Sequence, residues 1–162
     1  MDAATWIRAF RELHEKAKKG GLSSDEAAAY VDSKEQLARS LLAAQGLAMR
    51  QDESARRSFR VALMLQVELR MSERTVKTMT VDLSAGGFSA VVDPPPPLNV
   101  RLEFTLKRSS TEVLLTGKAK VVGAREIGRG ARVSFAFDAL APKEQEKLEM
   151  TLFDAALARM PS

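Results

Sequence analysis

Residues 56–87 read RRSFRVALMLQVELRMSERTVKTMTVDLSAGG, and this stretch predicts an antiparallel β-hairpin. Its first half alternates apolar and other residues, as a half-buried strand does, with the apolar ones at Val61, Leu63, Leu65, Val67 and Leu69. A second strand is expected to end near Leu83, after a polar turn at about residues 71–74. The hairpin would bring the two ends of the stretch together.

Four further segments downstream have the composition or the alternation of strands. They lie at about residues 88–92, 98–107, 113–122 and 131–137. The run Asp93-Pro94-Pro95-Pro96-Pro97 is expected to be an extended connection, because proline lacks the amide donor that a central strand needs. Six strands with no long helix between them favour an antiparallel barrel or sandwich. A last helix should begin near Pro142 and pack its apolar face on the sheet or across a barrel mouth.

The N-terminal third predicts two helices. Apolar residues recur at helical spacing until Gly20-Gly21, and Ser23 precedes Glu26 by three positions in a capping-box pattern. We expect a helical hairpin at residues 1–50 and a β domain with its C-terminal helix at 51–162. The hairpin is either a dimerisation or partner-docking element or a packing element of the barrel itself. His14 is expected at the surface or as a polar partner where the helices meet.

Composition excludes several classes of function. The chain has no cysteine and one histidine, which argues against a metal site, a catalytic triad or a thiol nucleophile. Its net charge of +4 suits an anionic ligand but is too small to indicate DNA binding by itself. No apolar run approaches the ~18 residues of a membrane span, and the N-terminus lacks a signal-peptide core, so we expect a cytoplasmic protein. We expect no enzymatic activity and no cofactor.

Two short motifs carry the chemistry of this chain. The first is Arg-x-x-x-Arg at Arg56 and Arg60, with Arg57 between them. The second is Asp-x-Ser-x-x-Gly, at Asp82, Ser84 and Gly87, with Gly86 inside it. A hairpin that turns at about residues 71–74 places Ala85 beside Arg60, within about two positions. The motifs should therefore be neighbours in space.

Together these residue types predict a site for a guanine nucleotide. Arginine donates paired hydrogen bonds to the guanine edge or to a phosphate. Asp82 offers two acceptors for the N1–H and N2–H₂ donors of guanine, and Ser84 can donate to a base or a phosphate. Gly86-Gly87 is expected to turn with positive φ and to let the backbone approach the ligand or form an anion-binding nest.

Each motif also has a purely structural explanation. The arginines can be a solvated run before a strand, and Asp-x-Ser with Gly-Gly is a common capped turn. Their order, their separation by one hairpin and their all-β setting favour the functional interpretation.

At these residues the sequence resembles the PilZ domain family, bacterial receptors for the second messenger cyclic di-GMP, over about residues 53–160. The resemblance implies a six-stranded antiparallel β-barrel with a C-terminal helix. It also implies ligand binding by Arg56 and Arg60 and by Asp82, Ser84 and Gly87, to which we add Arg57 and Gly86. The chain departs from many members at Gly123, where they have a tryptophan.

We therefore expect a receptor that couples cyclic di-GMP binding to a change in protein–protein interaction and so takes part in signal transduction. Ordering of residues 51–60 would move the helices of residues 1–50, which would bind a protein partner or a second copy. Two alternatives remain: an adaptor that ignores nucleotide, and an oligonucleotide-binding barrel. The latter should expose aromatic residues on a basic sheet face. Aromatic residues are only 6% of this chain, and Phe104, Phe135 and Phe137 alternate as core residues.

Overall fold

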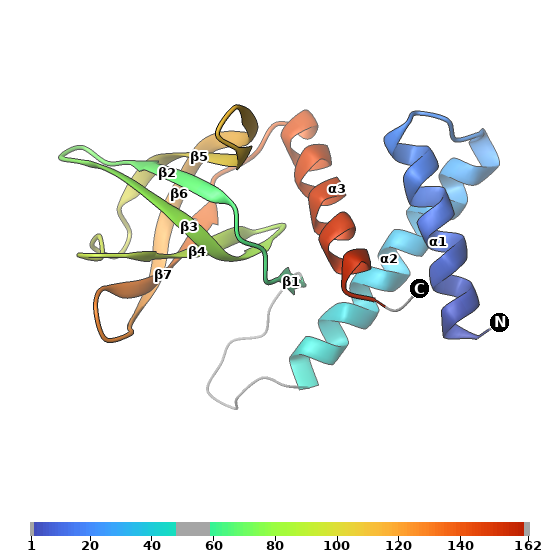
Figure 1. The fold of residues 1–162 in the computed structure, drawn as a ribbon, viewed down its shortest axis with the longest axis horizontal. Coiled ribbons are helices and arrows are strands. Elements are labelled where there is room, and N and C mark those ends of the chain that lie inside the picture. The colour runs from blue at the N-terminus through green and yellow to red at the C-terminus, as the bar shows by residue number, and fades with distance from the viewer. Residues whose placement is uncertain (1, 48–58, 161–162) are drawn as a thin grey trace. The chain divides into compact units, whose positions relative to one another are not determined.

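The computed structural model describes residues 2–47 and 59–160. The chain divides into two compact units, one formed by Met1–Phe59 with Phe153–Ser162 and the other by Arg60–Leu152. Their elements are labelled in Figure 1. The domain boundary expected near residue 50 stays a prediction.

The first unit begins with two helices whose ends follow from local sequence signals. Helix α1 (Ala3–Lys18) is capped by Asp2, whose carboxylate accepts a hydrogen bond from the Thr5 N–H at 2.8 Å. Gly20 follows it with φ +73°, a conformation that suits glycine. Helix α2 (Ser24–Leu47) starts with the predicted capping box. The Ser23 N–H donates to Glu26 at 3.1 Å and the Glu26 N–H donates to Ser23 Oγ at 3.2 Å.

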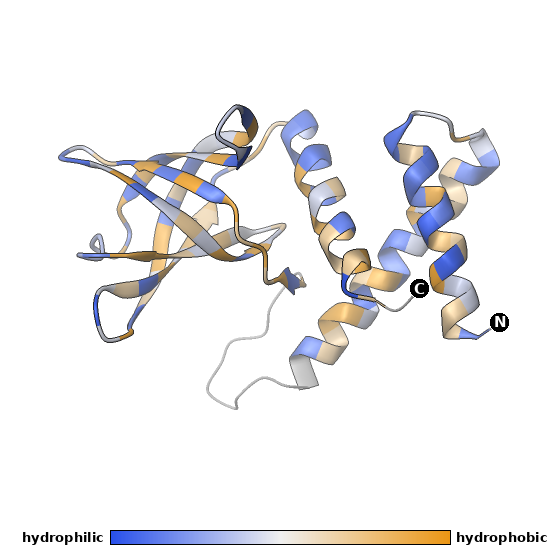
Figure 2. Cartoon of the chain, viewed as in Figure 1, coloured by the Kyte–Doolittle hydropathy of each residue, from blue (hydrophilic) through white to orange (hydrophobic). Residues whose placement is uncertain are grey.

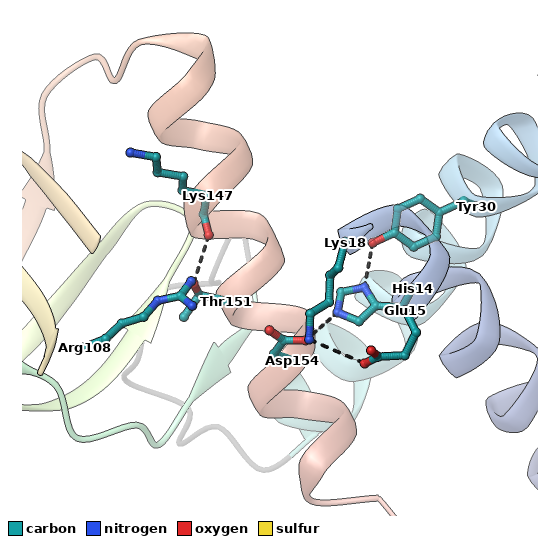
Figure 3. A network of polar contacts seen from close by, with 8 residues as sticks. All are labelled: His14, Glu15, Lys18, Tyr30, Arg108, Lys147, Thr151 and Asp154. Atoms are coloured by element: carbon teal, nitrogen blue, oxygen red, sulfur yellow. Dashed lines mark hydrogen bonds and ion pairs between the residues drawn. The ribbon is translucent and has the colours of Figure 1, made fainter. Parts of the chain in front are cut away.

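A buried polar cluster joins these helices to the end of α3 (Pro142–Ala158), as Figure 3 shows. His14 is only 1% exposed, and its ring nitrogens lie 2.6 Å from Tyr30 Oη and 2.7 Å from Asp154 Oδ1. Lys18 also contacts Asp154, at 3.1 Å. Of the two placements expected for His14, the surface is therefore wrong and the polar partner between helices is correct. A buried imidazole needs such partners, because burial without a hydrogen bond is costly.

The described part of the second unit is a closed antiparallel barrel, as predicted. Its strands are β1 (Arg60–Val61), β2 (Gln66–Arg70), β3 (Thr75–Ser84), β4 (Gly87–Val92), β5 (Arg101–Ser109), β6 (Glu112–Glu126) and β7 (Ala131–Phe137). The order β3-β2-β5-β6-β7-β4 closes because β4 also pairs with β3. The remaining strand, β1, pairs with the end of β3. Every strand edge of the six is thus paired, which removes open edges.

The predicted first strand is split in two. β1 and β2 both pair with β3, but residues 62–65 between them leave the ladder. The buried Thr80 hydroxyl on β3 bonds to this segment, donating to the Leu63 carbonyl at 2.6 Å and accepting from the Leu65 N–H at 2.8 Å. The Thr80 N–H also donates to the Leu65 carbonyl, at 2.8 Å. Alternation of apolar residues continues through the break, so the pattern alone could not reveal it.

The core of the barrel is formed by the buried apolar residues of the alternating strands. Figure 2 shows hydrophobic positions recurring along these strands. Phe88 and Phe135 stack at 4.8 Å, and Phe104 is fully buried beside them. Phe135 is 2% exposed, and Phe137 is half-buried within 5.2 Å of Phe104. The aromatic residues therefore belong to the core, as expected.

The strand expected at residues 98–107 begins later, at Arg101. Asn99 has φ +69° and Leu98 is 59% exposed. The left-handed conformation at Asn99 departs from extended strand geometry, and asparagine tolerates it better than most residues. The Asn99 N–H still donates to the Val121 carbonyl of β6 at 2.8 Å. The proline run at residues 94–97 lies outside the strands, as predicted.

The C-terminal helix α3 begins at Pro142, as predicted. In the second unit, Leu148 and Leu152 are 2% exposed, and Arg108 of β5 donates to the Thr151 hydroxyl at 2.9 Å. In the first unit, Phe153 packs against Phe10 with ring centroids 5.9 Å apart.

Candidate functional site

The site is built on the outer face of the barrel, where three strands place small and charged residues side by side. On β3, β4 and β7, Asp82 is paired with Ser89, which is paired with Ser134. In the neighbouring row, Ser84 is paired with Gly87. Residues paired directly across strands share one face, so both rows face outward while Leu83, Phe88 and Phe135 point into the core.

The hairpin brings the described parts of the two motifs together, as predicted. Arg60 is paired with Ser84, one position from the expected Ala85. Its Nη1 lies 3.7 Å from Asp82 Oδ2, with side-chain exposures of 39% and 14%. Arg56 and Arg57 lie outside the described residues, so their places in the site stay predictions.

Asp82 is the centre of a polar cluster. Ser89 Oγ donates to Asp82 Oδ1 at 2.8 Å, and Arg132 Nη2 donates to Asp82 Oδ2 at 2.7 Å. Arg132 Nε also donates to Ser89 Oγ, at 3.3 Å. Asp82 therefore has a close cation and a neutral donor, one on each carboxylate oxygen.

Ser84 shapes the turn between β3 and β4. Its hydroxyl accepts from the Gly86 N–H at 3.2 Å and donates to the Gly87 carbonyl at 3.3 Å. Both contacts are local, as in the capped turn considered above. The hydroxyl nonetheless lies on the same outer face as Arg60, because the two residues are paired.

The two glycines of the second motif play different parts from those expected. Neither has positive φ, so that expectation is wrong. A Cβ on Gly87 would lie 1.9 Å from the Phe135 carbonyl oxygen, so this glycine is needed where β4 approaches β7. A Cβ on Gly86 would meet only Ser84 Oγ, at 4.0 Å. The constraint at Gly87 is thus internal packing.

Sequence reasoning missed Ser89 and Arg132. Alternation gave one usable signal, because inward Ala131, Val133 and Phe135 place Arg132 on the outer face. That signal does not identify which residues of other strands lie beside Arg132 on this face. Arg132 reaches Asp82 only because β4 pairs with β7, across 50 positions of sequence.

The arrangement can bind a ligand that carries both hydrogen-bond donors and negative charge. A half-buried carboxylate suits a pair of N–H donors, such as the N1–H and N2–H₂ of guanine. The guanidinium of Arg60 suits a phosphate or a base edge. Among the described residues, no group of three or more acidic or histidine side chains is arranged to hold a metal ion. None of the described helices has the length and hydropathy of a membrane-spanning segment.

Comparison with protein-family models matches residues 54–154 to the PilZ domain. The matched range begins before Arg56, extends beyond the Asp82 cluster and covers well over half of the chain. A search of curated protein sequences finds no match.

Solved structures share the fold at low sequence identity. The PilZ domain of YcgR from Escherichia coli, solved with c-di-GMP, is 20% identical with a TM-score of 0.55, over 64% of this chain and 92% of that one. The MrkH–c-di-GMP complex from K. pneumonia is 18% identical with a TM-score of 0.58, over 65% and 54%. The Bacillus subtilis inhibitor of motility, MotI/DgrA, is 17% identical with a TM-score of 0.57, over 67% and 54%. The match thus spans about half of MrkH and of MotI/DgrA.

Proposed function

Because the chain belongs to the PilZ domain family, we propose that its barrel is a receptor for cyclic di-GMP. In this proposal Arg56 and Arg60 bind guanine edges and phosphates, with Arg57 in support. Asp82 and Ser84 read a guanine. The PilZ domain of YcgR and MrkH were both solved with this ligand, which supports the same ligand class here.

One observation carries the proposal: the pairing of Arg60 with Ser84, with the Asp82 carboxylate 3.7 Å from the Arg60 guanidinium. The two motifs were separate in sequence, and a purely structural origin of each would not require them to meet. Their meeting on an outward face supports one shared site. A direct ligand contact by Gly86 or Gly87 stays a prediction.

Calorimetric titration of the purified chain with cyclic di-GMP tests the proposal. Loss of one well-placed guanidinium should weaken binding by roughly 1–3 kcal/mol, so Arg60→Ala should cost about 10- to 100-fold in affinity. The double variant Arg56→Ala/Arg60→Ala should lose saturable binding. Arg101→Ala is the matched control, because Arg101 is 68% exposed on β5 and contacts Asp138 instead of Asp82.

Each outcome has a clear meaning. Binding that fails in the motif variants and persists in Arg101→Ala would support the receptor, and the stoichiometry would show whether one ligand or a stacked pair binds. Absence of binding by the wild-type protein would refute it and favour a nucleotide-independent adaptor.

We further propose that binding changes a protein–protein interaction, through a protein partner or self-association at the N-terminal helices. The segment expected to respond, residues 51–60, lies mostly outside the described residues. Sedimentation velocity with and without cyclic di-GMP, on the full chain and on Arg60→Ala, tests self-association. An unchanged sedimentation coefficient at saturating ligand would exclude self-association as the response. The bacterial cytoplasmic location stays a prediction.

A further inference from the structure

Asp82 is oriented by two residues that neither motif contains. Arg132 and Ser89 each donate one hydrogen bond to a different oxygen of its carboxylate, at 2.7 and 2.8 Å. The two donors also contact each other at 3.3 Å. Ser89 is 2% exposed, and the Arg132 side chain is 33% exposed. Both carboxylate oxygens thus accept a hydrogen bond, one from Ser89 on β4 and one from Arg132 on β7.

These contacts leave Asp82 able to accept more hydrogen bonds. An ionised carboxylate has about four acceptor positions, two on each oxygen. Arg132 and Ser89 use one position on each oxygen. One further position on each oxygen is the arrangement that two neighbouring N–H donors need.

The two arginines near Asp82 lie at different distances from its carboxylate. Arg132 Nη2 lies at hydrogen-bonding distance from Oδ2, whereas Arg60 Nη1 lies 3.7 Å from the same atom and is more exposed. A guanine edge on Asp82 would exclude water from the carboxylate without supplying a charge. Burying a carboxylate is costly unless a cation stays beside it. Arg132, at hydrogen-bonding distance from Oδ2, is the cation that supplies this charge.

We propose that Arg132, supported by Ser89, is a positioning residue for Asp82. It fixes the direction of the carboxylate and balances its charge, so that Asp82 accepts the N1–H and N2–H₂ of guanine. Arg60 can then bind the ligand directly. The inference rests on the proposed function and assigns selectivity for guanine to a pair of residues outside both motifs.

The test compares binding of cyclic di-GMP with that of cyclic di-IMP, whose bases lack the 2-amino group. The wild-type protein should prefer cyclic di-GMP by about 10-fold or more, because hydrogen bonds to a charged acceptor are lost with the analogue. Arg132→Ala should reduce this preference to within about threefold. Arg132→Lys should keep part of the preference for cyclic di-GMP. Ser89→Ala, a smaller change, should leave a preference between those of the wild-type protein and Arg132→Ala.

Arg125→Ala is the matched control. Arg125 is exposed on β6 and paired with Arg132, so its removal changes the net charge equally and leaves the contacts of Asp82 in place. It should retain the wild-type preference. Thermal unfolding of each variant identifies any that fails to fold, and Ser89→Ala then carries the test alone.

The outcomes separate this inference from the function on which it rests. Equal weakening of both ligands by Arg132→Ala, with the preference retained, would overturn the positioning role while leaving the receptor intact. An unchanged preference in Ser89→Ala when Arg132→Ala does not fold would do the same. No preference in the wild-type protein would also overturn it. No binding of either ligand to the wild-type protein would overturn both proposals.

Discussion

Replacing Gly87 by alanine should destabilise the barrel strongly, whatever the ligand. The added Cβ would lie 1.9 Å from the Phe135 carbonyl oxygen and 3.1 Å from the Ala136 Cα. A carbon and an oxygen normally approach to about 3.3 Å, so β4 and β7 would have to separate locally by about 1.4 Å. Both obstructing groups are backbone, so no side-chain rotation can relieve the overlap.

The cost follows from what such a separation breaks. Phe88 pairs with Phe135 next to Gly87, and their rings stack at 4.8 Å. Losing a neighbouring ladder hydrogen bond costs about 0.5–1.5 kcal/mol, with about 1–3 kcal/mol more for each buried group left unpaired. Losing the stack costs about 0.5–1.5 kcal/mol. With one buried group left unpaired, these terms predict that Gly87→Ala lowers the free energy of unfolding by about 2–6 kcal/mol.

Urea denaturation followed by far-ultraviolet circular dichroism measures this effect. Fluorescence is less suitable, because the single tryptophan, Trp6, belongs to α1 and not to the barrel. Gly86→Ala is the matched control, with only Ser84 Oγ at 4.0 Å from its added Cβ, and it should stay within about 1 kcal/mol of wild type. A Gly87→Ala protein equally close to wild type would refute the reasoning.

Three further predictions concern stability. Thr80→Val should lower the free energy of unfolding by about 1–3 kcal/mol, because it leaves the Leu65 N–H and the Leu63 carbonyl without the Thr80 hydroxyl. Urea denaturation measures this change, and a neutral effect would mean that water replaces the hydroxyl. Tyr30→Phe should cost about 1 kcal/mol by removing the hydroxyl 2.6 Å from His14 Nδ1, and an unchanged thermal midpoint would contradict this. Hydrogen bonding from Lys16 is the main cause that lowers the pKa of Glu26. A carboxyl group whose pKa is lowered in the folded protein adds stability above the ordinary glutamate pKa, and this stability is lost as pH falls through the pKa of the folded state. Glu26→Gln should therefore be less stable than wild type at neutral pH and equally stable in acid. A difference that persists in acid would argue against this origin.

Much of the fold could be predicted because its signals are local. Alternating apolar residues predicted the barrel strands, and the turn near residues 71–74 predicted the register that pairs Arg60 with Ser84. The capping box at Ser23 and Glu26 was equally readable. Each of these depends on residues a few positions apart, or on one hairpin whose turn determines the pairing.

Other features could not be read because they depend on packing between distant segments. At the break in residues 62–65, the Leu63 carbonyl and the Leu65 N–H bond to the hydroxyl of Thr80, which lies on the partner strand. His14 could be placed only once Asp154 was known to lie beside it, 140 positions away. In both cases a buried polar group needs a partner that the local pattern does not identify.

For the candidate site, the sequence alone determined that Arg60 lies beside the second motif in the hairpin, because strand period and turn position are local properties. Tertiary structure alone decided that Arg132 and Ser89 hold Asp82 and that Gly87 is required by the carbonyl of Phe135. Both follow from the pairing of β4 with β7 as the barrel closes. Alternation tells which face of a strand a residue occupies, whereas the identity of its neighbour across the sheet depends on the closure of the whole barrel.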